Sequence, residues 1–238
     1  MLPSGQQCLV MLAAQLGKHT TLSDADAALI TSLTTRAILA EARQDYRGSD
    51  SVWLLAKGSV ARFEETLDDG RQVTGLYFSG DLFGLSAIML PKPTLSYEIL
   101  ERSWLYAMSI ADMRRAIHHS PRLMEALWRH TCIEAVRTDK WLLNVGRRDA
   151  RGRLAHLLRE LAYRAMGDMD VIPSSFRLSM SKLQMADATG MTPVYVYRIL
   201  MSLRSESIFS VSGGLAYLQD WDRLVDIAEF DKSYLCQK

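Results

Sequence analysis

Cysteine is scarce in this sequence. Its three cysteines, Cys8, Cys132 and Cys236, lie far apart, and none belongs to a C-x-x-C pair. This spacing signals neither a zinc site nor a disulfide framework, so reduced thiols are the simplest interpretation. Three scattered cysteines also do not supply the four ligands that an iron–sulfur cluster takes. We therefore expect no metal site and a reducing compartment.

Long apolar runs are also missing, because no stretch reaches the length that spans a membrane. The first 19 residues are moderately apolar but have no basic residue ahead of their apolar part. They fit an amphipathic helix better than a signal peptide. We therefore expect a cytoplasmic protein with no membrane partner.

The chain has little excess of either charge, with 28 Lys and Arg against 27 Asp and Glu and a net charge of +1. The bias is local. Between Arg147 and Arg204 ten basic residues stand against five acidic ones, and the balance turns acidic afterwards. A bias confined to one segment is typical of one basic face of one domain, although a merely solvated basic surface fits it equally well.

Catalytic motifs are absent as well. We find no HExxH, no G-x-S-x-G and no phosphate-binding glycine loop. An enzyme is therefore not expected, and no catalytic residue is assigned.

The first half of the chain predicts a short helix followed by many strands. Residues 22–33 fit a helix, with Ser23 as N-cap and Asp26 at the capping-box position. From about 36 to 110, short apolar runs alternate with turns, and Asp69-Gly70 is a strong hairpin signal. Such spacing indicates an all-β barrel or roll, whose last strand we place at 97–108.

Residues 109–166 are expected to be helical, with a fresh start at Ser120-Pro121. Two apolar stripes run along this segment, which suggests that one faces the β domain and the other a second subunit. A helix lying across its own domain is the alternative. We assign to the dimer interface the stripe formed by Leu123, Leu127, His130, Glu134, Arg137 and Trp141.

The segment 181–204 predicts two helices around a tight turn. The first covers about 181–188, the turn is Thr189-Gly190-Met191, and Thr192 and Pro193 begin the second helix. Two strands around Ser212-Gly213-Gly214 then have the form of a wing.

The order of roll, long helix, helix-turn-helix and wing resembles the Crp/Fnr superfamily of bacterial transcription factors. KGSVARFEETLDDGRQVTGLYFSGDLFGL is similar to its β-roll signature, SPRLMEAL to the opening of its dimer helix, and RGRLAHLLREL to the start of its DNA-binding domain. TPVYVYRILMSLR resembles the T-P-V-H-V-N-R-x-L-x-x-L-R recognition helix of one subgroup, which also shares the Asp220-Trp221 and Phe230-Asp231 segments.

The resemblance implies an α+β chain with three parts: a jelly-roll-like β-roll of the cyclic-nucleotide-binding type with an N-terminal helix at 1–119, a dimerisation helix at 120–146, and a winged helix-turn-helix at 147–238. It implies a homodimer on a pseudo-palindromic operator in double-stranded DNA, with RNA polymerase as a further partner of an activator. The alternatives are an effector-independent regulator and a ligand-binding scaffold that does not bind DNA.

The recognition helix would read DNA through the side chains of its first two turns. Arg198 matches the arginine that reads a guanine in the family, with a surface salt bridge as its alternative role. Val194 stands where relatives often carry a glutamate that pairs with a cytosine, so a thymine methyl group is an alternative contact. The other expected base and phosphate contacts are Pro193, Tyr195, Tyr197, Thr192, Lys182, Ser181 and Ser202.

The roll suggests a sensor without a familiar cofactor. Cyclic-nucleotide binders of the family carry a G-E-L motif and a phosphate-binding arginine, but Leu85 follows Gly84 here, the arginine position falls at Pro93, and no arginine occurs between Arg71 and Arg102. Cyclic AMP is therefore not expected, nor is haem. An apolar effector pocket, or simply the roll's core, is predicted from Phe83, Leu85, Tyr97, Trp104 and Thr138.

Overall fold

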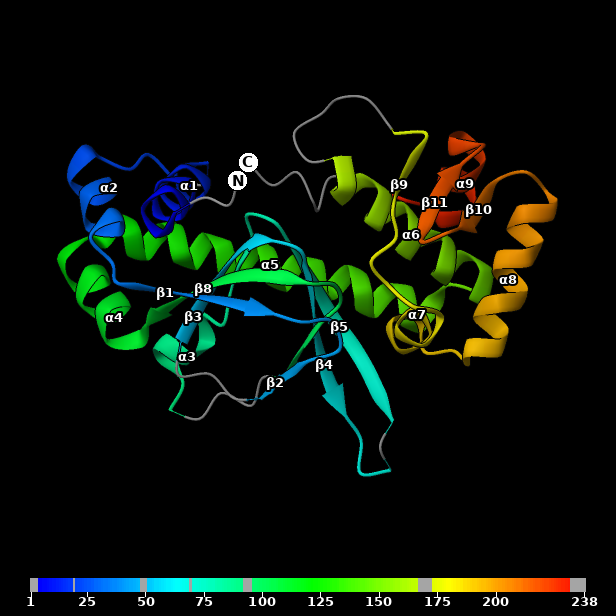
Figure 1. Ribbon diagram of the computed structural model, residues 1–238, viewed down its shortest axis with the longest axis horizontal. Helices are drawn as coiled ribbons and strands as arrows, with labels where there is room; N and C mark the ends of the chain where they lie inside the picture. The colour runs from blue at the N-terminus through cyan, green and yellow to red at the C-terminus, as the bar shows by residue number, and fades with distance from the viewer. Residues whose placement is uncertain are drawn as a thin grey trace. The chain divides into compact units, whose positions relative to one another are not determined.

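The computed structural model describes residues 4–18, 20–47, 51–68, 70–91, 96–166 and 173–231. Its contacts divide the chain into two compact units. The first consists mainly of residues 1–64 and 75–138, and the second of residues 65–74 and 139–233. Figure 1 labels most of the helices and strands of both units.

The first unit opens with two capped helices, α1 (Gly5–Gly17) and α2 (Asp24–Thr31). Each begins with a capping box, formed by Ser4 and Gln7 in α1 and by Ser23 and Asp26 in α2. These reciprocal bonds satisfy backbone N–H groups that a helix start leaves without partners. The predicted N-terminal helix and the helix predicted at 22–33 are therefore confirmed.

Two antiparallel four-stranded sheets form the β-roll (Figure 1). One has the strand order β1-β8-β3-β6 and the other β2-β7-β4-β5. Their strands are β1 (Thr35–Ala40), β2 (Asp45–Arg47), β3 (Ser51–Lys57), β4 (Ser59–Glu65), β5 (Arg71–Phe78), β6 (Leu82–Phe83), β7 (Ser96–Ile99) and β8 (Ser103–Ser109). The short helix α3 (Ser86–Met89) follows β6.

The single strand predicted at 97–108 is wrong, because this segment is two strands in different sheets. β7 pairs with β2 and β4, whereas β8 pairs with β1 and β3. The chain changes sheets at Leu100–Arg102, where Leu100 N donates to the carbonyl of Ser59. The predicted Asp69-Gly70 hairpin turn lies only partly in the described residues, and there Thr66 N donates to the carbonyl of Gly70 over 2.8 Å.

Side chains of β3 point alternately to its two faces, and each face belongs to a different hydrophobic core. Val52 and Leu54 pack with α1, α4 and α5, while Trp53 and Leu55 pack between the sheets. Successive strand residues point to opposite faces, so one strand serves both cores. Every residue from 51 to 55 is buried as a result.

Three helices follow the roll: α4 (Ile110–His119), α5 (Pro121–Arg147) and α6 (Ala150–Met166). Ser120 separates α4 from α5 and accepts a bond from Leu123 N, as expected of a cap. The predicted break after Gly146 falls at Arg148 and Asp149. None of the described helices combines the length and apolar character that crossing a bilayer requires.

Among the described residues, the second unit contains three further helices and a small sheet after α6. The helices of the helix-turn-helix are α7 (Lys182–Thr189) and α8 (Pro193–Ser205), and α9 (Trp221–Ala228) closes the unit. The two predicted wing strands are β10 (Phe209–Ser212) and β11 (Leu215–Leu218). They join β9 (Ser175–Arg177) in a sheet of order β10-β11-β9, so the segment predicted as a polar loop at 167–177 contains a strand. The predicted three-domain division stays a prediction.

Candidate nucleic-acid interface and effector pocket

Local capping chemistry sets both ends of α7. Ser181 and Gln184 form a capping box at its start, and Gly190 ends it in the left-handed region with φ of 64°. Glycine adopts that conformation without the penalty that a Cβ brings. A Cβ built at Gly190 would also lie 3.4 Å from Val145 Cγ1. The predicted Thr189-Gly190-Met191 turn is thus confirmed.

Thr192 and Pro193 start α8 as predicted. The Thr192 hydroxyl accepts a bond from Tyr195 N, and proline takes the first helical position, where its missing N–H leaves no bond unmade. The buried side of α8 consists of Val196, Ile199, Leu200 and Leu203.

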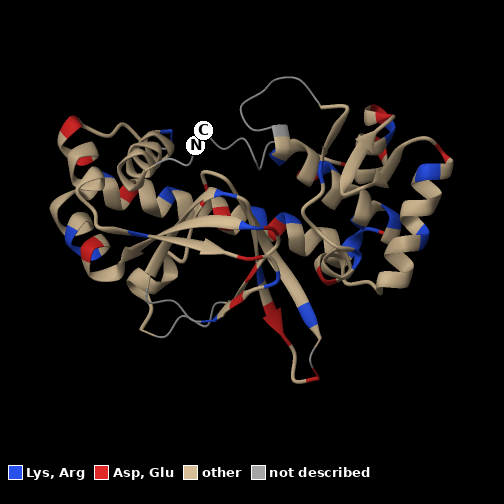
Figure 2. Cartoon of the chain, in the orientation of Figure 1, with Lys and Arg blue, Asp and Glu red and all other residues tan. Residues whose placement is uncertain are grey.

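The opposite side of α8 is exposed and carries Arg198. The apolar and aromatic side chains beside it are exposed to large fractions: Val194 62%, Tyr195 48%, Tyr197 47% and Met201 40%. Residues three and four apart share one side of a helix, so Val194, Tyr197, Arg198 and Met201 form a continuous surface. Basic bands lie on α8 and its neighbours in Figure 2.

Some polar side chains around this surface are exposed, and others form hydrogen bonds within the chain. Ser181 and Lys182 are exposed, and Lys182 Nζ lies 4.5 Å from the centre of the Tyr197 ring. Ser202 is half-buried, and its hydroxyl donates to Glu206 Oε1 at 3.0 Å and accepts from Arg151 at 3.2 Å. The predicted phosphate contact by Ser202 does not fit this geometry, because its hydroxyl braces α8 against α6.

Glu206 accepts the hydrogen bonds that connect the end of α8 to α6. Arg151 donates to both carboxylate oxygens at 2.6 and 2.8 Å, and Arg223 adds a third contact at 2.8 Å. The hydrogen bonds from Arg151 and Ser202 lower the pKa of Glu206 from 4.5 to about 2. Bidentate pairing of this kind fixes orientation, so it holds the C-terminal end of α8 in place.

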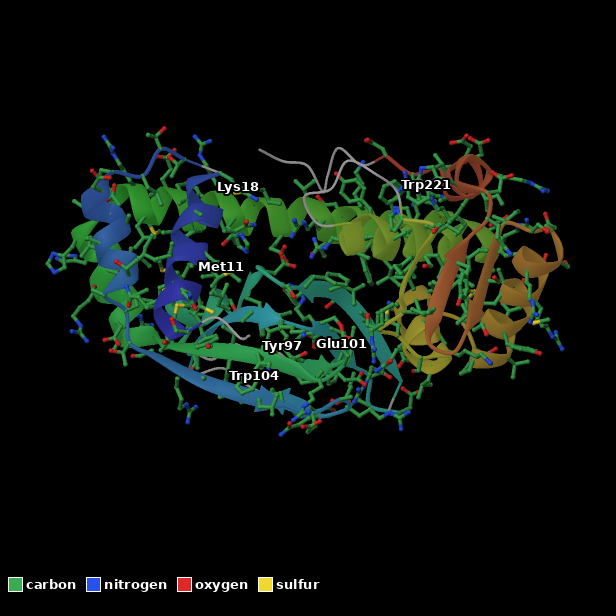
Figure 3. The ribbon with its side chains drawn as sticks, turned by 45° about the horizontal axis from the view of Figure 1, so that its top comes forward. Met11, Lys18, Tyr97, Glu101, Trp104 and Trp221 are labelled. Carbon is green, nitrogen blue, oxygen red and sulfur yellow. The ribbon has the colours of Figure 1, made fainter. Side chains whose placement is uncertain are left out.

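Trp221 begins α9 and lies against α6 (Figure 3). The Arg159 guanidinium is 3.2 Å from the centre of the Trp221 ring and 4.8 Å from that of Phe230. Cation–π contacts of a buried arginine are favourable, so the D-W and F-D segments noted in the sequence stabilise the helix packing of this unit.

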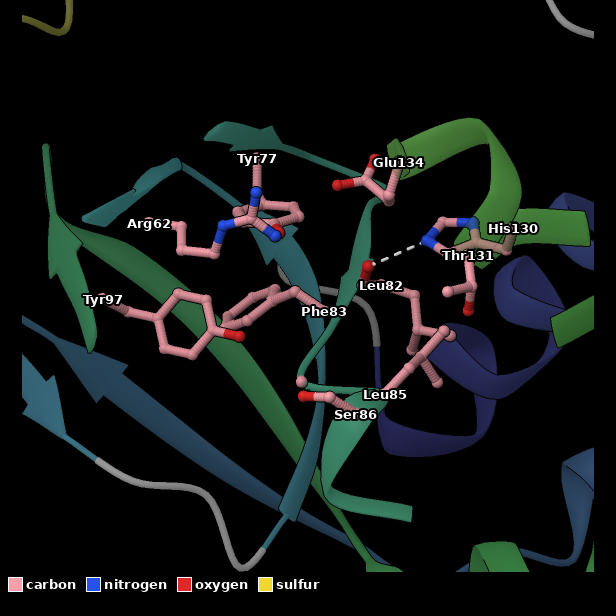
Figure 4. Close-up of a pocket in the computed structure, with 11 residues that line it drawn as sticks. Arg62, Tyr77, Leu82, Phe83, Leu85, Ser86, Tyr97, His130, Thr131 and Glu134 are labelled. Atoms are coloured by element: carbon pink, nitrogen blue, oxygen red, sulfur yellow. Dashed lines mark hydrogen bonds between the residues drawn. The ribbon is translucent and has the colours of Figure 1, made fainter. Parts of the chain in front are cut away.

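A pocket of about 140 Å³ opens in the first unit between the roll and α5. Figure 4 shows aromatic side chains from the roll on one side and His130, Thr131 and Glu134 of α5 on the other. His130 Nε2 lies 3.0 Å from the carbonyl oxygen of Leu82, which ties the helix to β6. The ring centroids of Phe83 and Tyr97 are 4.8 Å apart.

Arg62 of β4 brings a guanidinium into this pocket. Its Nη2 donates to Thr138 Oγ1 at 3.2 Å, and its Nη1 lies 3.5 Å from the Tyr77 hydroxyl. Burial raises the pKa of Tyr97 to about 12 and that of Tyr77 well above its ordinary value, so both hydroxyls keep their protons. The pocket therefore combines apolar rings with several hydrogen-bond donors.

The structure places three of the five predicted pocket residues, Phe83, Leu85 and Tyr97, in the lining. Trp104 of β8 is not in the lining (Figure 3). Its neighbour Leu105 packs between the sheets, so the Trp104 side chain points to the opposite face of the strand. Thr138 does not line the pocket either, but it holds Arg62. Sequence reasoning missed Arg62, Tyr77 and Glu134. The family pattern places its phosphate-binding arginine after Gly84, whereas Arg62 lies before it, on β4.

The stripe of α5 predicted to face a second subunit packs inside its own chain instead. Leu123 and Leu127 are 1% and 4% exposed and belong to the roll's core. His130 and Trp141 are also buried, and Trp141 Nε1 donates to Glu160 at 3.0 Å. Glu134 and Arg137 pair with each other. Burial in the same chain leaves these residues little surface for a partner.

The other stripe of α5 is exposed. Trp128 is 66% exposed, Leu142 72% and Leu143 45%, with Cys132 and Ala135 between them. Trp128, Ala135 and Leu142 are seven residues apart, the repeat that places side chains along the seam of a coiled coil. Of the two apolar stripes, the described part of the chain thus buries the one predicted for the dimer interface and leaves the other exposed.

Comparison with known proteins agrees with this architecture. Residues 152–227 match the family of Crp-like helix-turn-helix domains. The fumarate and nitrate reduction regulatory protein of Yersinia pestis is 24% identical over 179 residues, which cover 75% of this chain and 71% of that protein. Its counterpart in Vibrio cholerae is 23% identical over 182 residues, covering 76% and 72%.

Solved structures share the fold. FixK2 from Bradyrhizobium japonicum has a TM-score of 0.74 at 24% identity, covering 82% of this chain and 98% of its own. A Crp/Fnr-family transcriptional regulator from Thermus thermophilus has a TM-score of 0.65 at 17% identity, covering 82% and 99%. The roll, long helix and winged helix-turn-helix thus define a chain with the fold of these regulators. The family match covers the helix-turn-helix part of the chain, and the solved structures show that the chain as a whole shares their fold.

Proposed function

We propose that this chain is a homodimeric, sequence-specific DNA-binding regulator whose DNA affinity responds to a signal sensed in the β-roll. The observation that carries the proposal is the exposed surface of α8, which presents Arg198 among side chains that are 40–62% exposed. An arginine on a recognition helix donates two bonds to guanine O6 and N7. The recognition-helix pattern further suggests the subgroup with T-P-V-x-V-x-R.

The dimer is proposed to form through the exposed stripe of α5. Two such helices related by a two-fold axis bury Trp128 and Leu142 against each other, as isologous interfaces do. The two recognition helices then reach successive major grooves about one helical turn apart on a pseudo-palindromic site. The protein would act in the cytoplasm, with RNA polymerase as a further partner if it activates.

The signal is proposed to act at the pocket between the roll and α5. A cavity of about 150 Å³ accommodates a molecule of benzene, so the volume of about 140 Å³ suits a ligand of about one ring. We include neither a cyclic nucleotide nor haem nor an iron–sulfur cluster in the proposal. Because the pocket joins both elements, a ligand there can shift the population of dimers with correctly spaced helices.

The test is selection of binding sites from random duplex DNA with the full chain, followed by affinity measurements at two salt concentrations. We expect a two-fold symmetric consensus. Arg198→Ala should cost about 1–3 kcal/mol of discrimination at one position of each half-site. The matched control, Arg204→Ala, removes the same charge from the end of α8 and should keep the sequence preference. Weak binding that ignores both sequence and Arg198 would support the scaffold alternative.

A further inference from the structure

The DNA-facing surface of α8 is mainly apolar. Val194 is 62% exposed, and Met201 lies two turns further along the helix at 40%. The one guanidinium among the first two turns is that of Arg198. Valine has no hydrogen-bond donor or acceptor, so it cannot satisfy the polar edges of guanine, cytosine or adenine that it would cover. Covering such an edge without a hydrogen bond is unfavourable.

Double-stranded DNA offers one apolar group in its major groove, the C5 methyl group of thymine. The exposed cations of the helix-turn-helix are Arg198, one turn from Val194, Lys182 at the start of α7 beside Tyr197, and Arg204 at the far end of α8. They suit a phosphate-lined groove and not an apolar protein partner. The Lys182 ammonium, 4.5 Å from the centre of the Tyr197 ring, keeps that ring beside the same groove-facing surface.

The spacing of Val194 and Arg198 gives the position of the methyl group. Four residues of helix rise about 6 Å, whereas successive bases of one strand lie about 3.4 Å apart. The two side chains therefore reach bases about one to two steps apart. We propose that Val194 reads the methyl group of a thymine one or two base pairs from the guanine read by Arg198. This inference rests on the proposed function.

The experiment uses the duplex selected above and the full dimeric chain. Each thymine of the half-site is replaced in turn, symmetrically, by deoxyuridine, which removes the methyl group and keeps every hydrogen bond of the base pair. One buried methyl group corresponds to about a fourfold change in affinity, so we expect roughly a 15-fold loss when both half-sites lack it. The loss should occur at one position, within two base pairs of the guanine.

Two variants assign the effect to Val194. Val194→Ala shortens an exposed side chain, so its helix content should match that of the parent protein by circular dichroism. The affinities of this variant for the thymine and deoxyuridine duplexes should agree within about twofold. In a double-mutant cycle, removing the methyl group has little further effect once its partner side chain has been removed. Met201→Ala, the matched control on the same surface, should keep the full deoxyuridine effect.

Several results would overturn the proposal. If deoxyuridine at every position leaves the affinity unchanged while the selected site still depends on Arg198, the methyl contact is wrong and the proposed function stands. If Val194→Ala keeps the deoxyuridine effect, another residue reads the methyl group. If no sequence is selected at all, both the contact and the proposed function fail.

Discussion

Leu127 and Trp128 are neighbours on α5 with opposite environments, at 4% and 66% exposed. In a homodimer joined through the exposed stripe, Trp128→Ala should weaken association and leave the fold of each chain intact. Leu127→Ala should instead leave a cavity in the roll's core. Such truncations lower the free energy of unfolding by about 2–5 kcal/mol.

The size of the association effect follows from the exposed area. A tryptophan buries about 150–250 Å², and 66% of Trp128 is exposed. About 100–165 Å² per subunit is thus open to a partner, which amounts to about 2.5–4 kcal/mol. The two copies of a symmetric dimer together give an upper bound of about 5–8 kcal/mol. Because buried area converts only in part to binding free energy, we expect a loss of about 3 kcal/mol. The Kd of the dimer should then rise roughly 100-fold.

Sedimentation equilibrium of both variants and the parent protein gives the dimer Kd. Urea unfolding at a dilution where every protein is monomeric gives the stability of the chain alone, which removes the linkage between association and stability. The reasoning is refuted if Leu127→Ala dissociates the dimer at unchanged monomer stability while Trp128→Ala keeps the parent Kd.

Three further predictions concern the second unit. Trp141→Phe removes the donor to buried Glu160 and should lower the unfolding free energy by about 1.5–3 kcal/mol in urea titrations; an unchanged midpoint would contradict this. Burial and the charges of Arg148 and Lys140 lower the pKa of His156 from 6.5 to about 3. Its contribution to stability is therefore present above pH 6.5 and lost as the pH falls towards 3, so His156→Gln should flatten the stability profile across that range. Glu206, with its pKa lowered to about 2, contributes above pH 4.5 and loses that contribution towards pH 2. Glu206→Gln should remove only this more acidic part, and profiles that match the parent would contradict both assignments.

Local signals in the sequence account for the elements that were predicted correctly. Ser23 with Asp26 and Thr192 with Pro193 act within one helical turn, so their residue types alone specify where α2 and α8 begin. The recognition surface follows directly, because the helical repeat places Val194 and Arg198 on one side. No knowledge of distant residues is needed for these features.

Features that depend on distant partners were not predictable in the same way. Leu127 and Trp128 are both apolar, and only the packing of the roll decides which of them is buried. Arg62 enters the pocket because β4 passes beside α5. Its hydrogen-bond partner Thr138 is 76 residues away in the chain. In each case the deciding contact is tertiary.

The strand order of the first sheet has a consequence for synthesis on the ribosome. β8 lies between β1 and β3, with Thr35 opposite Met108 and Val52 opposite the same residue on the other side. The strand at the centre of the sheet is therefore the last to be made. At about 5–20 residues per second, β1 and β3 emerge several seconds before their shared neighbour. During that interval their open edges can pair with other nascent chains, so a chain whose synthesis ends before Ser103 is prone to aggregate.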